Sequence, residues 1–512
     1  MKKALIVLTM LAVALSAGAQ TFVMNNGAEI ESLDPAVMES VTSHRVYMAL
    51  FEGLFISDPK TNAPLPGMAT KYKFSSDYKT VTFTLRKAYW SDGVQVTAQD
   101  FVDSWIRKLD PKNAFTYADL LWDIVGAQEF STGKGTAAGV GLKALNPTTF
   151  EVKLKNPTPH FVQKVVHYAF AVVPMHAIKK YGADWVLPKN LVVNGAYLLK
   201  EWRPQEKMVF TPNPKYWDAK NVKIKELVLL PIDDVNTAYN MYINGDIDWI
   251  DVVPAELMDT IKLRADYHVG PEYGTYYLNI NVTKKPLDDA RVRQALSMAF
   301  DRTVLTNTIL KSHFPAFANV PPSAGYTPPK GTGYNPEEAK KLLAAAGYPG
   351  GAGFPKFQLL YNTSSNHQKV MQFIQAEWKK NLGIEVELIN QEFTTYLDTK
   401  SAHDFDIARA GWIADYLDPA TFLDMWETGN SQNDGLYSSK EYDALLVKSR
   451  TQLGAARLKT MMEAEAVLIN KDMGIIPIYY YQTQAMIDLT KWNGWFLNPM
   501  NVHAWKFISP KK

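Results

Sequence analysis

The chain has 512 residues, with 54 Lys and Arg against 52 Asp and Glu, a formal net charge of +2 and no cysteine. The absence of cysteine excludes disulfides, thiol nucleophiles and Cys-ligated metal sites. Because the charges are balanced and interspersed, the composition gives no electrostatic reason to expect nucleic acid or an anionic membrane as a partner. A chain of this length buries a large core and predicts two or three domains.

The N-terminus has the pattern of a secretory signal peptide. Lys2 and Lys3 supply the positive charge, Ala4–Leu15 the apolar stretch, and Ala17-Gly18-Ala19 a small-residue cleavage site. The apolar stretch is shorter than the roughly 20 residues that span a bilayer. We therefore expect export and cleavage after Ala19. Because no cysteine follows the apolar stretch, we expect no lipid anchor.

The first elements after this segment are marked by alternation and by capping residues. Residues 79–85 alternate apolar and polar side chains, which predicts a strand with one buried face. Thr97 is the expected N-cap of a helix that places Phe101 and Trp105 on one side and stops before Pro111. Residues 148–154 form a second alternating strand.

The C-terminal half carries signals of an α/β sheet. Asp288 or Asp289 is expected to start a helix, and Asn335-Pro336 to start another that closes at Gly347. Strands are predicted over residues 357–361 and 384–389, on either side of a helix over residues 367–381. Such a strand–helix–strand unit predicts the α/β class.

No motif indicates an enzyme. The sequence lacks a His-Glu-x-x-His metal helix, a Gly-x-Ser-x-Gly elbow and a dinucleotide fingerprint, and its nine His are scattered. Gly133-Lys134-Gly135 does not have the spacing of a phosphate loop, because Gln128 occupies the place of the first glycine. We expect an exposed loop there.

Two lone charges stand out in the apolar stretch 405–419. Asp418 precedes Pro419 and is expected to be an N-cap with proline at the first helical position. Arg409 and Asp415 have no such local role. They either pair with each other or provide a fork for a ligand carboxylate and a counter-ion for a ligand amine. A zwitterionic ligand such as a peptide needs both charges.

The sequence resembles the periplasmic oligopeptide-binding proteins, the peptide-family (family 5) solute receptors of ABC importers. The resemblance covers essentially the whole chain after residue 19. Its motifs are Asn25-Asn26-Gly27, Ser32-Leu33-Asp34-Pro35, Trp90-Ser91-Asp92-Gly93, Asn194-Gly195-Ala196-Tyr197, Arg291-Val292-Arg293, residues 338–343, residues 359–364 and Ala408-Arg409-Ala410-Gly411-Trp412.

The resemblance implies a two-lobed periplasmic-binding-protein fold of the α/β class, with an additional inserted domain. Domain I would comprise residues 20–51, 174–278 and 482–512, domain II the inserted residues 52–173, and domain III residues 279–481. The lobes would close over an extended peptide whose main chain pairs with protein strands. The function implied is capture of short peptides in the periplasm and delivery to the permease subunits of an ABC importer, by a monomer without cofactor or enzymatic activity.

The resemblance also implies roles for individual residues. Asp415 would meet the peptide ammonium, and Arg409 and His367 the carboxylates of peptides of different length. Gly411 and Ile413, beside Trp412, would pair with the peptide main chain, opposite Glu39-Ser40-Val41. Tyr117 and Tyr276 would line the cleft. Phe393 and Lys400 belong to side-chain pockets, where they replace the Trp and Arg of the best-known members. The lysine that helps to read the carboxylate falls near Lys311.

Two rival functions are open from the sequence alone. One is a receptor for another solute, such as nickel, a sugar or a murein peptide; the pair Asp415 and Arg409 argues against a neutral sugar, and the scattered His against a metal cage. The other is a hydrolase or a peptide-acting chaperone.

Overall fold

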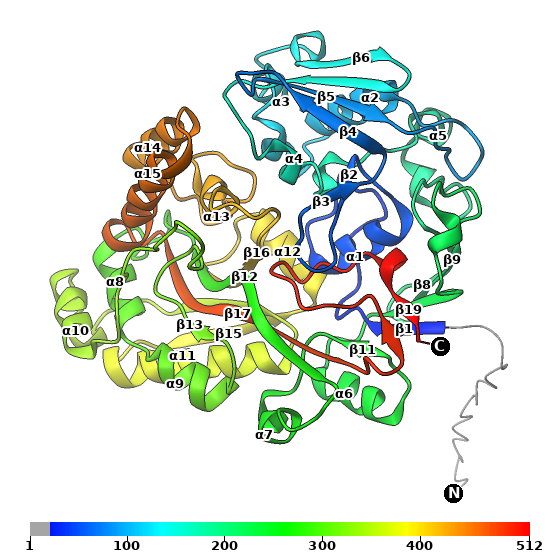
Figure 1. The fold of residues 1–512 in the computed structure, drawn as a ribbon. Helices are drawn as coiled ribbons and strands as arrows, with labels where there is room; N and C mark the ends of the chain where they lie inside the picture. Colours follow the sequence, from blue (N-terminus) through cyan, green and yellow to red (C-terminus); the bar gives the residue numbers. More distant parts are fainter. Residues whose placement is uncertain (1–20, 512) are drawn as a thin grey trace, which may run out of the picture.

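Two β-sheets organise the chain in the computed structural model, which describes residues 21–511 (Figure 1). The predicted signal peptide, residues 1–19, lies outside the described residues. The larger sheet has eleven strands. Its order is β15 (Val386–Gln391), β14 (Phe357–Asn362), β16 (Ile407–Ile413), β12 (Tyr267–Ile280), β17 (Ile475–Ile487), β11 (Trp249–Ile250), β1 (Thr21–Asn25), β10 (Glu226–Leu230), β9 (Lys207–Pro212) and β8 (Tyr197–Arg203), with β13 (Phe314–Pro315) paired to β17.

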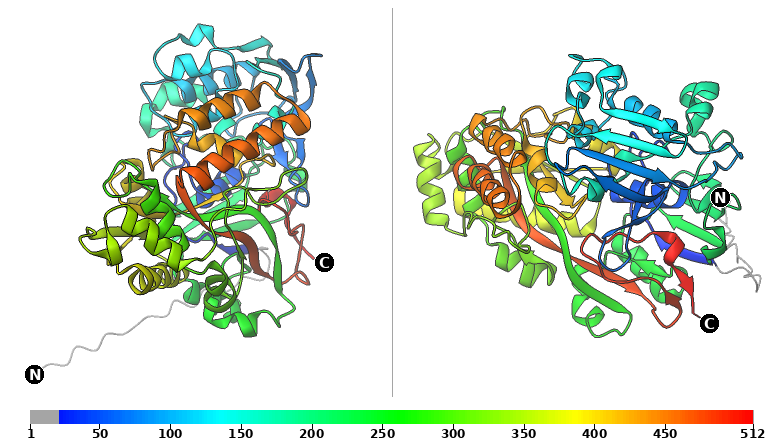
Figure 2. Two further views of the ribbon diagram at one scale, coloured as in Figure 1. Left: turned by 90° about the vertical axis from the view of Figure 1, so that its left-hand side faces the viewer. Right: turned by 45° about the horizontal axis from the view of Figure 1, so that its top comes forward.

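Two long antiparallel strands run through the middle of this sheet. β12 has 14 residues and β17 has 13, and they pair from Tyr267↔Met486 to Asn279↔Ile475 with two register shifts. Figures 1 and 2 show them crossing the molecule side by side, from β11 and β1 toward the strands β14 and β15. Segments that are far apart in the sequence are therefore joined by one continuous pair of strands.

A separate four-stranded sheet lies at the top of Figure 1, in the order β4 (Ala69–Phe74), β5 (Thr80–Leu85), β7 (Thr149–Lys153) and β6 (Leu142–Asn146). The predicted strands at residues 79–85 and 148–154 are confirmed, and β5 buries every second residue. Helix α2 (Ala98–Leu109) begins as predicted, because Thr97 and Asp100 form a capping box. Its Trp105 is fully buried, with ring centroids 5.0 Å from Phe150.

The predicted strand–helix–strand unit is confirmed. β14 and β15 are parallel and are joined by α11 (Ser365–Leu382). β15 lies two residues later than predicted. Asp289 caps α8 (Ala290–Met298), and Asn335 caps α10 (Pro336–Ala345), which has proline in its first turn. The chain is of the α/β class.

The remaining elements are shorter or connect these layers. The helices are α1 (Val41–Leu50), α3 (Ala127–Ser131), α4 (Phe161–Lys164), α5 (Met175–Tyr181), α6 (Val235–Asn244), α7 (Met258–Ile261), α9 (Arg302–Val304), α12 (Phe393–Ser401), α13 (Ala420–Leu423), α14 (Lys440–Arg450) and α15 (Gly454–Ala466). Two small sheets pair β2 (Phe55–Ser57) with β3 (Pro64–Pro66) and β18 (Trp492–Asn493) with β19 (Ser509–Pro510). The expected loop at residues 133–135 is exposed. Across residues 21–511, no helix combines the length and apolar character needed to cross a membrane.

Candidate functional site

A cavity of about 430 Å³ lies where β16, α12 and the start of α1 meet. These elements lie near the centre of Figure 1. Its wall is drawn from segments between residues 25 and 503. The predicted site residues that line it are Glu39, Val41, Tyr117, His367, Phe393, Lys400, Arg409, Gly411, Trp412, Ile413 and Asp415.

Tyr276 was predicted to line the cleft, and the structure contradicts this. Its side chain is fully buried behind the wall, stacked on Tyr479 with centroids 4.5 Å apart and lying beneath the guanidinium of Arg409 at 4.9 Å. Its neighbour Tyr277 lines the cavity instead. Successive side chains of a strand point to opposite faces, so one position in β12 decides which tyrosine reaches the cavity.

Strand β16 presents a free main-chain edge to this cavity. On one side it pairs with β12 along its full length, from Gly274↔Ile413 to Ile280↔Ile407. On the other side β14 pairs only with Ile407 and Ala408, so within the described chain residues 409–413 have no strand partner there. Gly411 is the exposed residue of this edge. A methyl group on Gly411 would meet the hydroxyl of Tyr481 at 2.3 Å, so this position has room for glycine alone unless Tyr481 moves.

The carboxylate of Asp415 lies just beyond one end of β16. Its side chain is 9% exposed, and its Oδ1 lies 3.2 Å from Nε2 of His167. Its own amide donates to the hydroxyl of Thr421 at 3.0 Å. The hydroxyl of Thr421 also donates to Oδ2 of Asp415 at 3.5 Å. These two contacts leave part of the acceptor capacity of the carboxylate unused, since each carboxylate oxygen accepts about two hydrogen bonds.

Arg409 lies further back in the strand and does not pair with Asp415. Among the described residues no ion pair joins Arg409 to Asp415, which lies beyond the end of β16 and contacts His167 instead. Arg409 instead donates from Nη1 to Oδ1 of Asn362 at 3.0 Å. Its buried Nε finds no hydrogen-bond partner among the described residues. The strand is therefore flanked by an acid at one end and a base with an unused donor at the other.

His367 lies beside Arg409 at the start of α11. Its Nδ1 is 3.4 Å from the hydroxyl of Tyr276. Burial, together with the charge of Arg409, lowers the pKa of His367 well below the ordinary value. The imidazole is therefore neutral at pH 7 and offers a single N–H donor.

The opposite wall is formed by the start of α1. Ser40 caps this helix by accepting a hydrogen bond from Ser43, and the next residue, Val41, is 45% exposed although it is apolar. Burial raises the pKa of Glu39 to about 6, with the positive charge of Lys400 opposing that rise. Lys400 is itself paired with Asp434 at 2.8 Å.

Two further expectations near the site are corrected. Helix α13 has Pro419, not Asp418, as its N-cap. Asp418 still accepts a hydrogen bond from the amide of Ala420 at 2.9 Å, and its main partner is the fork of Arg457, with both contacts at 2.8 Å. Lys311 is not among the residues that line the cavity; it forms an ion pair with Asp259.

Sequence reasoning missed several residues of the wall. His167, the partner of Asp415, is separated from it by 248 positions, about half of the chain, and carries no local signal. Tyr481 and His313 approach the site from β17 and from the segment before β13, and their rings lie 5.7 Å apart. Glu272 also lines the cavity; burial and then the charge of Asp251 raise its pKa to about 7. The run of aromatic residues in β17 was the one signal that could have indicated Tyr481.

Comparison with known proteins identifies relatives over nearly the whole chain. The family model of bacterial extracellular solute-binding proteins, family 5 Middle, matches residues 63–434. The periplasmic oligopeptide-binding protein OppA of Escherichia coli (strain K12) is 40% identical over 482 residues, which cover 91% of this chain and 88% of that protein. The structure of Haemophilus influenzae OppA in complex with RPPGFSPFR matches with a TM-score of 0.92 at 35% identity, covering 96% of this chain and 99% of that one.

One relative provides two structures for comparison. The Escherichia coli murein tripeptide binding protein MppA matches with a TM-score of 0.93 at 36% identity, covering 97% of this chain and 99% of that one. The unliganded open form of MppA matches at 37% identity with a TM-score of only 0.65, covering 96% and 98%. Since the identities are nearly equal, the lower score reflects a different arrangement of the parts. The arrangement in this structure is therefore not that of the open form, and the chain belongs to family 5 of the bacterial extracellular solute-binding proteins.

Proposed function

We propose that the protein captures short peptides in the cavity beside β16 and delivers them to an ABC importer. The observation that carries the proposal is the free edge of residues 409–413, which lies inside a cavity and between two complementary charges. An extended peptide adds to such an edge as a further strand and takes its affinity from main-chain hydrogen bonds. The names of the relatives, which are peptide-binding proteins, agree with this proposal.

The charges define the direction in which the peptide binds. Asp415 is placed to receive the α-ammonium, while Arg409 and the neutral His367 are placed to receive the α-carboxylate of peptides that differ in length. An extended chain covers about 3.3–3.6 Å per residue, so about three to six residues span the strand between the two charges. Gly411 leaves the main-chain edge clear of side chains at its centre.

Side-chain specificity is expected to be low in this arrangement. The pocket charge of Lys400 is already neutralised by Asp434, so this pair does not require an oppositely charged ligand group. Water can fill what a small side chain leaves empty, at a cost of about 0–2 kcal/mol for each ordered molecule.

The proposed domain division keeps the predicted boundaries. Domain I comprises residues 20–51, 174–278 and 482–512, domain II residues 52–173, and domain III residues 279–481. Two features support it: the four-stranded sheet lies wholly within residues 52–173, and β12 and β17 are the strands that pass between domains I and III. Two crossing strands are a suitable hinge, because small changes in their dihedral angles swing one lobe against the other.

The proposed function also implies where the protein acts and in what form. The protein would be exported, cleaved after Ala19 and released into the periplasm as a monomer that binds peptide without hydrolysing it. The relatives OppA and MppA of Escherichia coli are named periplasmic, which supports this location.

The proposal is tested by adding a mixture of tripeptides to the purified, unliganded protein. Binding should shrink the radius of gyration in solution scattering and raise the melting temperature, because a ligand at 100 times its dissociation constant stabilises the folded state by about 2.7 kcal/mol. Mass spectrometry of the recovered peptides should show no cleavage. If no peptide of two to six residues changed either quantity, the receptor function would be excluded, and cleavage products would indicate a hydrolase.

A further inference from the structure

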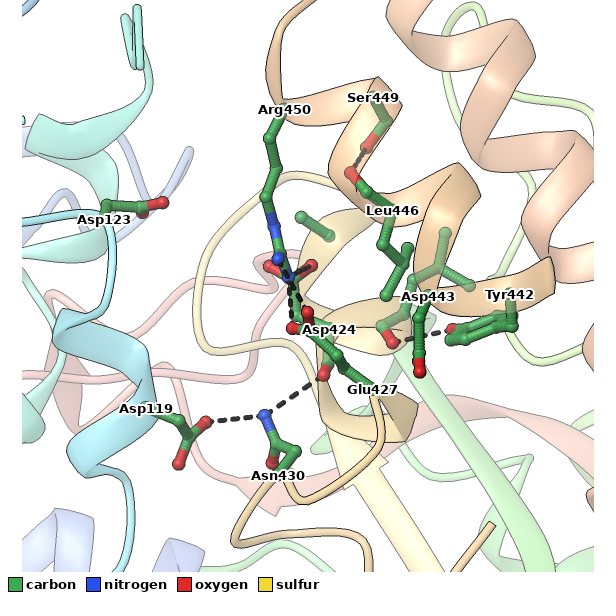
Figure 3. Close-up of polar contacts among 12 residues, drawn as sticks. Asp119, Asp123, Asp424, Glu427, Asn430, Tyr442, Asp443, Leu446, Ser449 and Arg450 are labelled. Carbon is green, nitrogen blue, oxygen red and sulfur yellow. Dashed lines mark hydrogen bonds and ion pairs between the residues drawn. The ribbon is translucent and has the colours of Figure 1, made fainter. Parts of the chain in front are cut away.

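A cluster of hydrogen bonds beside the cavity joins residues 117–119 to residues 430–431, at a place that carries none of the proposed ligand charges. Asn430 donates from Nδ2 to Oδ2 of Asp119 at 2.9 Å, and the hydroxyl of Ser431 donates to Oδ1 of the same carboxylate. That hydroxyl also accepts a hydrogen bond from the amide of Tyr117 at 3.3 Å. Figure 3 shows Asp119 and Asn430 facing each other from two separate segments of the chain.

The segment that carries Asn430 is held rigid by contacts of its own. Nδ2 of Asn430 also donates to the carbonyl of Asp424 at 3.1 Å, and its Oδ1 accepts from the amide of Gln432 at 2.9 Å. Arg450, at the end of α14, binds Asp424 at 2.8 Å and Glu427 at 2.7 Å (Figure 3). The amide of Asn430 is therefore aimed at Asp119 before any contact forms, and little ordering entropy is lost when it does.

The segment that carries Asp119 also holds Tyr117, a residue of the cavity wall, in an unusual backbone conformation. Tyr117 has φ +58°, in the left-handed region that non-glycine residues rarely adopt. Its buried ring lines the cavity, with its centroid 5.0 Å from that of His167 and 6.0 Å from that of Trp412. His167 is the partner of Asp415. The position of the Tyr117 backbone therefore determines one wall of the site where the peptide ammonium is proposed to bind.

We propose that Asn430 and Ser431 form a latch on Asp119 and on the amide of Tyr117, and that this latch sets how long a peptide stays bound. The inference rests on the proposed peptide-binding function. Hydrogen bonds to an ionised carboxylate are stronger than those between neutral groups. These bonds require the two segments to be in contact, so they stabilise the closed arrangement over an open one. The peptide leaves only after opening, so weakening the latch should change dissociation far more than association.

The test uses the full-length mature protein and trialanine, with intrinsic tryptophan fluorescence in stopped flow as the signal. Asn430→Ala should accelerate dissociation about tenfold, which corresponds to about 1.4 kcal/mol, and change the association rate less than about twofold. Ser431→Ala alters an exposed side chain that is not expected to impair folding, and it should accelerate dissociation in the same direction, whereas Ser431→Thr keeps the hydroxyl and should restore the wild-type rate. Ser438→Ala is the matched control, since Ser438 is exposed and lies in the same region, and among the described residues its hydroxyl bonds only to Thr428, at 3.1 Å.

A double-mutant cycle distinguishes loss of the latch from a general loss of stability. In an Asp119→Ala background, Asn430→Ala should add little to the dissociation rate, because the partner is already gone. Unchanged dissociation in both Asn430→Ala and Ser431→Ala, with trialanine still bound by the wild type, would overturn the latch. A wild type that binds no peptide at all would instead overturn the proposed function.

Discussion

Removing the carboxylate of Asp415 should weaken the binding of peptides that have a free amine. The side chain is 9% exposed, and its described side-chain partners are His167 at 3.2 Å and Thr421 at 3.5 Å. In the closed cavity a peptide ammonium would lose its water and depend on this carboxylate. Truncating one member of a buried, hydrogen-bonded charge pair costs about 2–5 kcal/mol. Asp415→Ala should therefore raise the dissociation constant roughly 30-fold or more, since each 1.4 kcal/mol is a factor of about ten.

Calorimetry with a tripeptide and its N-acetylated form isolates this interaction. The acetylated peptide brings no ammonium, so it should bind the wild type poorly and lose little further in Asp415→Ala. His167→Ala is the matched control, because it removes the protein partner of Asp415 and keeps the charge. A variant that lacks only the imidazole should still distinguish the two peptides.

The alternative is that Asp415 serves only to hold His167 in place. Asp415→Ala and His167→Ala would then have equal effects, and acetylation of the peptide would not matter. Equal affinity of the wild type for the free and acetylated peptides would refute the ammonium site.

Three further predictions concern the peptide side chains, the strand edge and pH. Tripeptides that differ only in the central residue should bind within roughly two orders of magnitude in calorimetry, under about 3 kcal/mol; one obligatory side chain would favour a murein-peptide receptor instead. Gly411→Ala should weaken tripeptide binding about tenfold, because its methyl group would meet Tyr481 at 2.3 Å; an unchanged dissociation constant would show that this edge is not used. Burial raises the pKa of Glu465 from 4.5 to about 7, so the folded state holds its proton more tightly than the unfolded chain and the free energy of unfolding falls as pH rises between these values. In urea denaturation, the free energy of unfolding of Glu465→Gln should fall over that pH range by up to about 3 kcal/mol less than that of the wild type. If the free energies of unfolding of the two proteins changed with pH in parallel, this prediction would be contradicted.

The sequence predicted elements whose signals are local and left open those set by distant contacts. The capping box at Thr97 and the proline after Asn335 mark helix starts that the structure keeps, because each satisfies the helix terminus with its own neighbours. Eleven of the twelve site residues that the resemblance implied line one cavity, and their roles toward a peptide stay predictions. Tyr276 was misplaced because successive side chains of β12 point to opposite faces, and the sequence does not show which of two adjacent tyrosines faces the cavity.

The partners of the charged residues in the site could not be predicted from the local sequence either. The pairing of Arg409 with Asp415 remained open from composition alone, and the structure gives the two residues different partners. Conversely, the contact of Asp415 with His167 depends on how separate parts of the chain meet. Nothing in the segment around His167 predicts that contact, because the preceding helix α4 has only four residues and carries no periodic pattern.

The unpaired edge of β16 has a consequence for solubility. An uncovered strand edge is a template on which another copy of the chain can add a strand, and natural sheets commonly protect such edges with charges, bulges or covering segments. Here residues 409–413 are protected by enclosure, since their edge faces the inside of the molecule. A bound peptide would occupy the hydrogen-bonding groups that a second copy would need. A bound peptide would then also protect the strand edge from self-association. The protein would be most prone to aggregation while it is open and without a peptide.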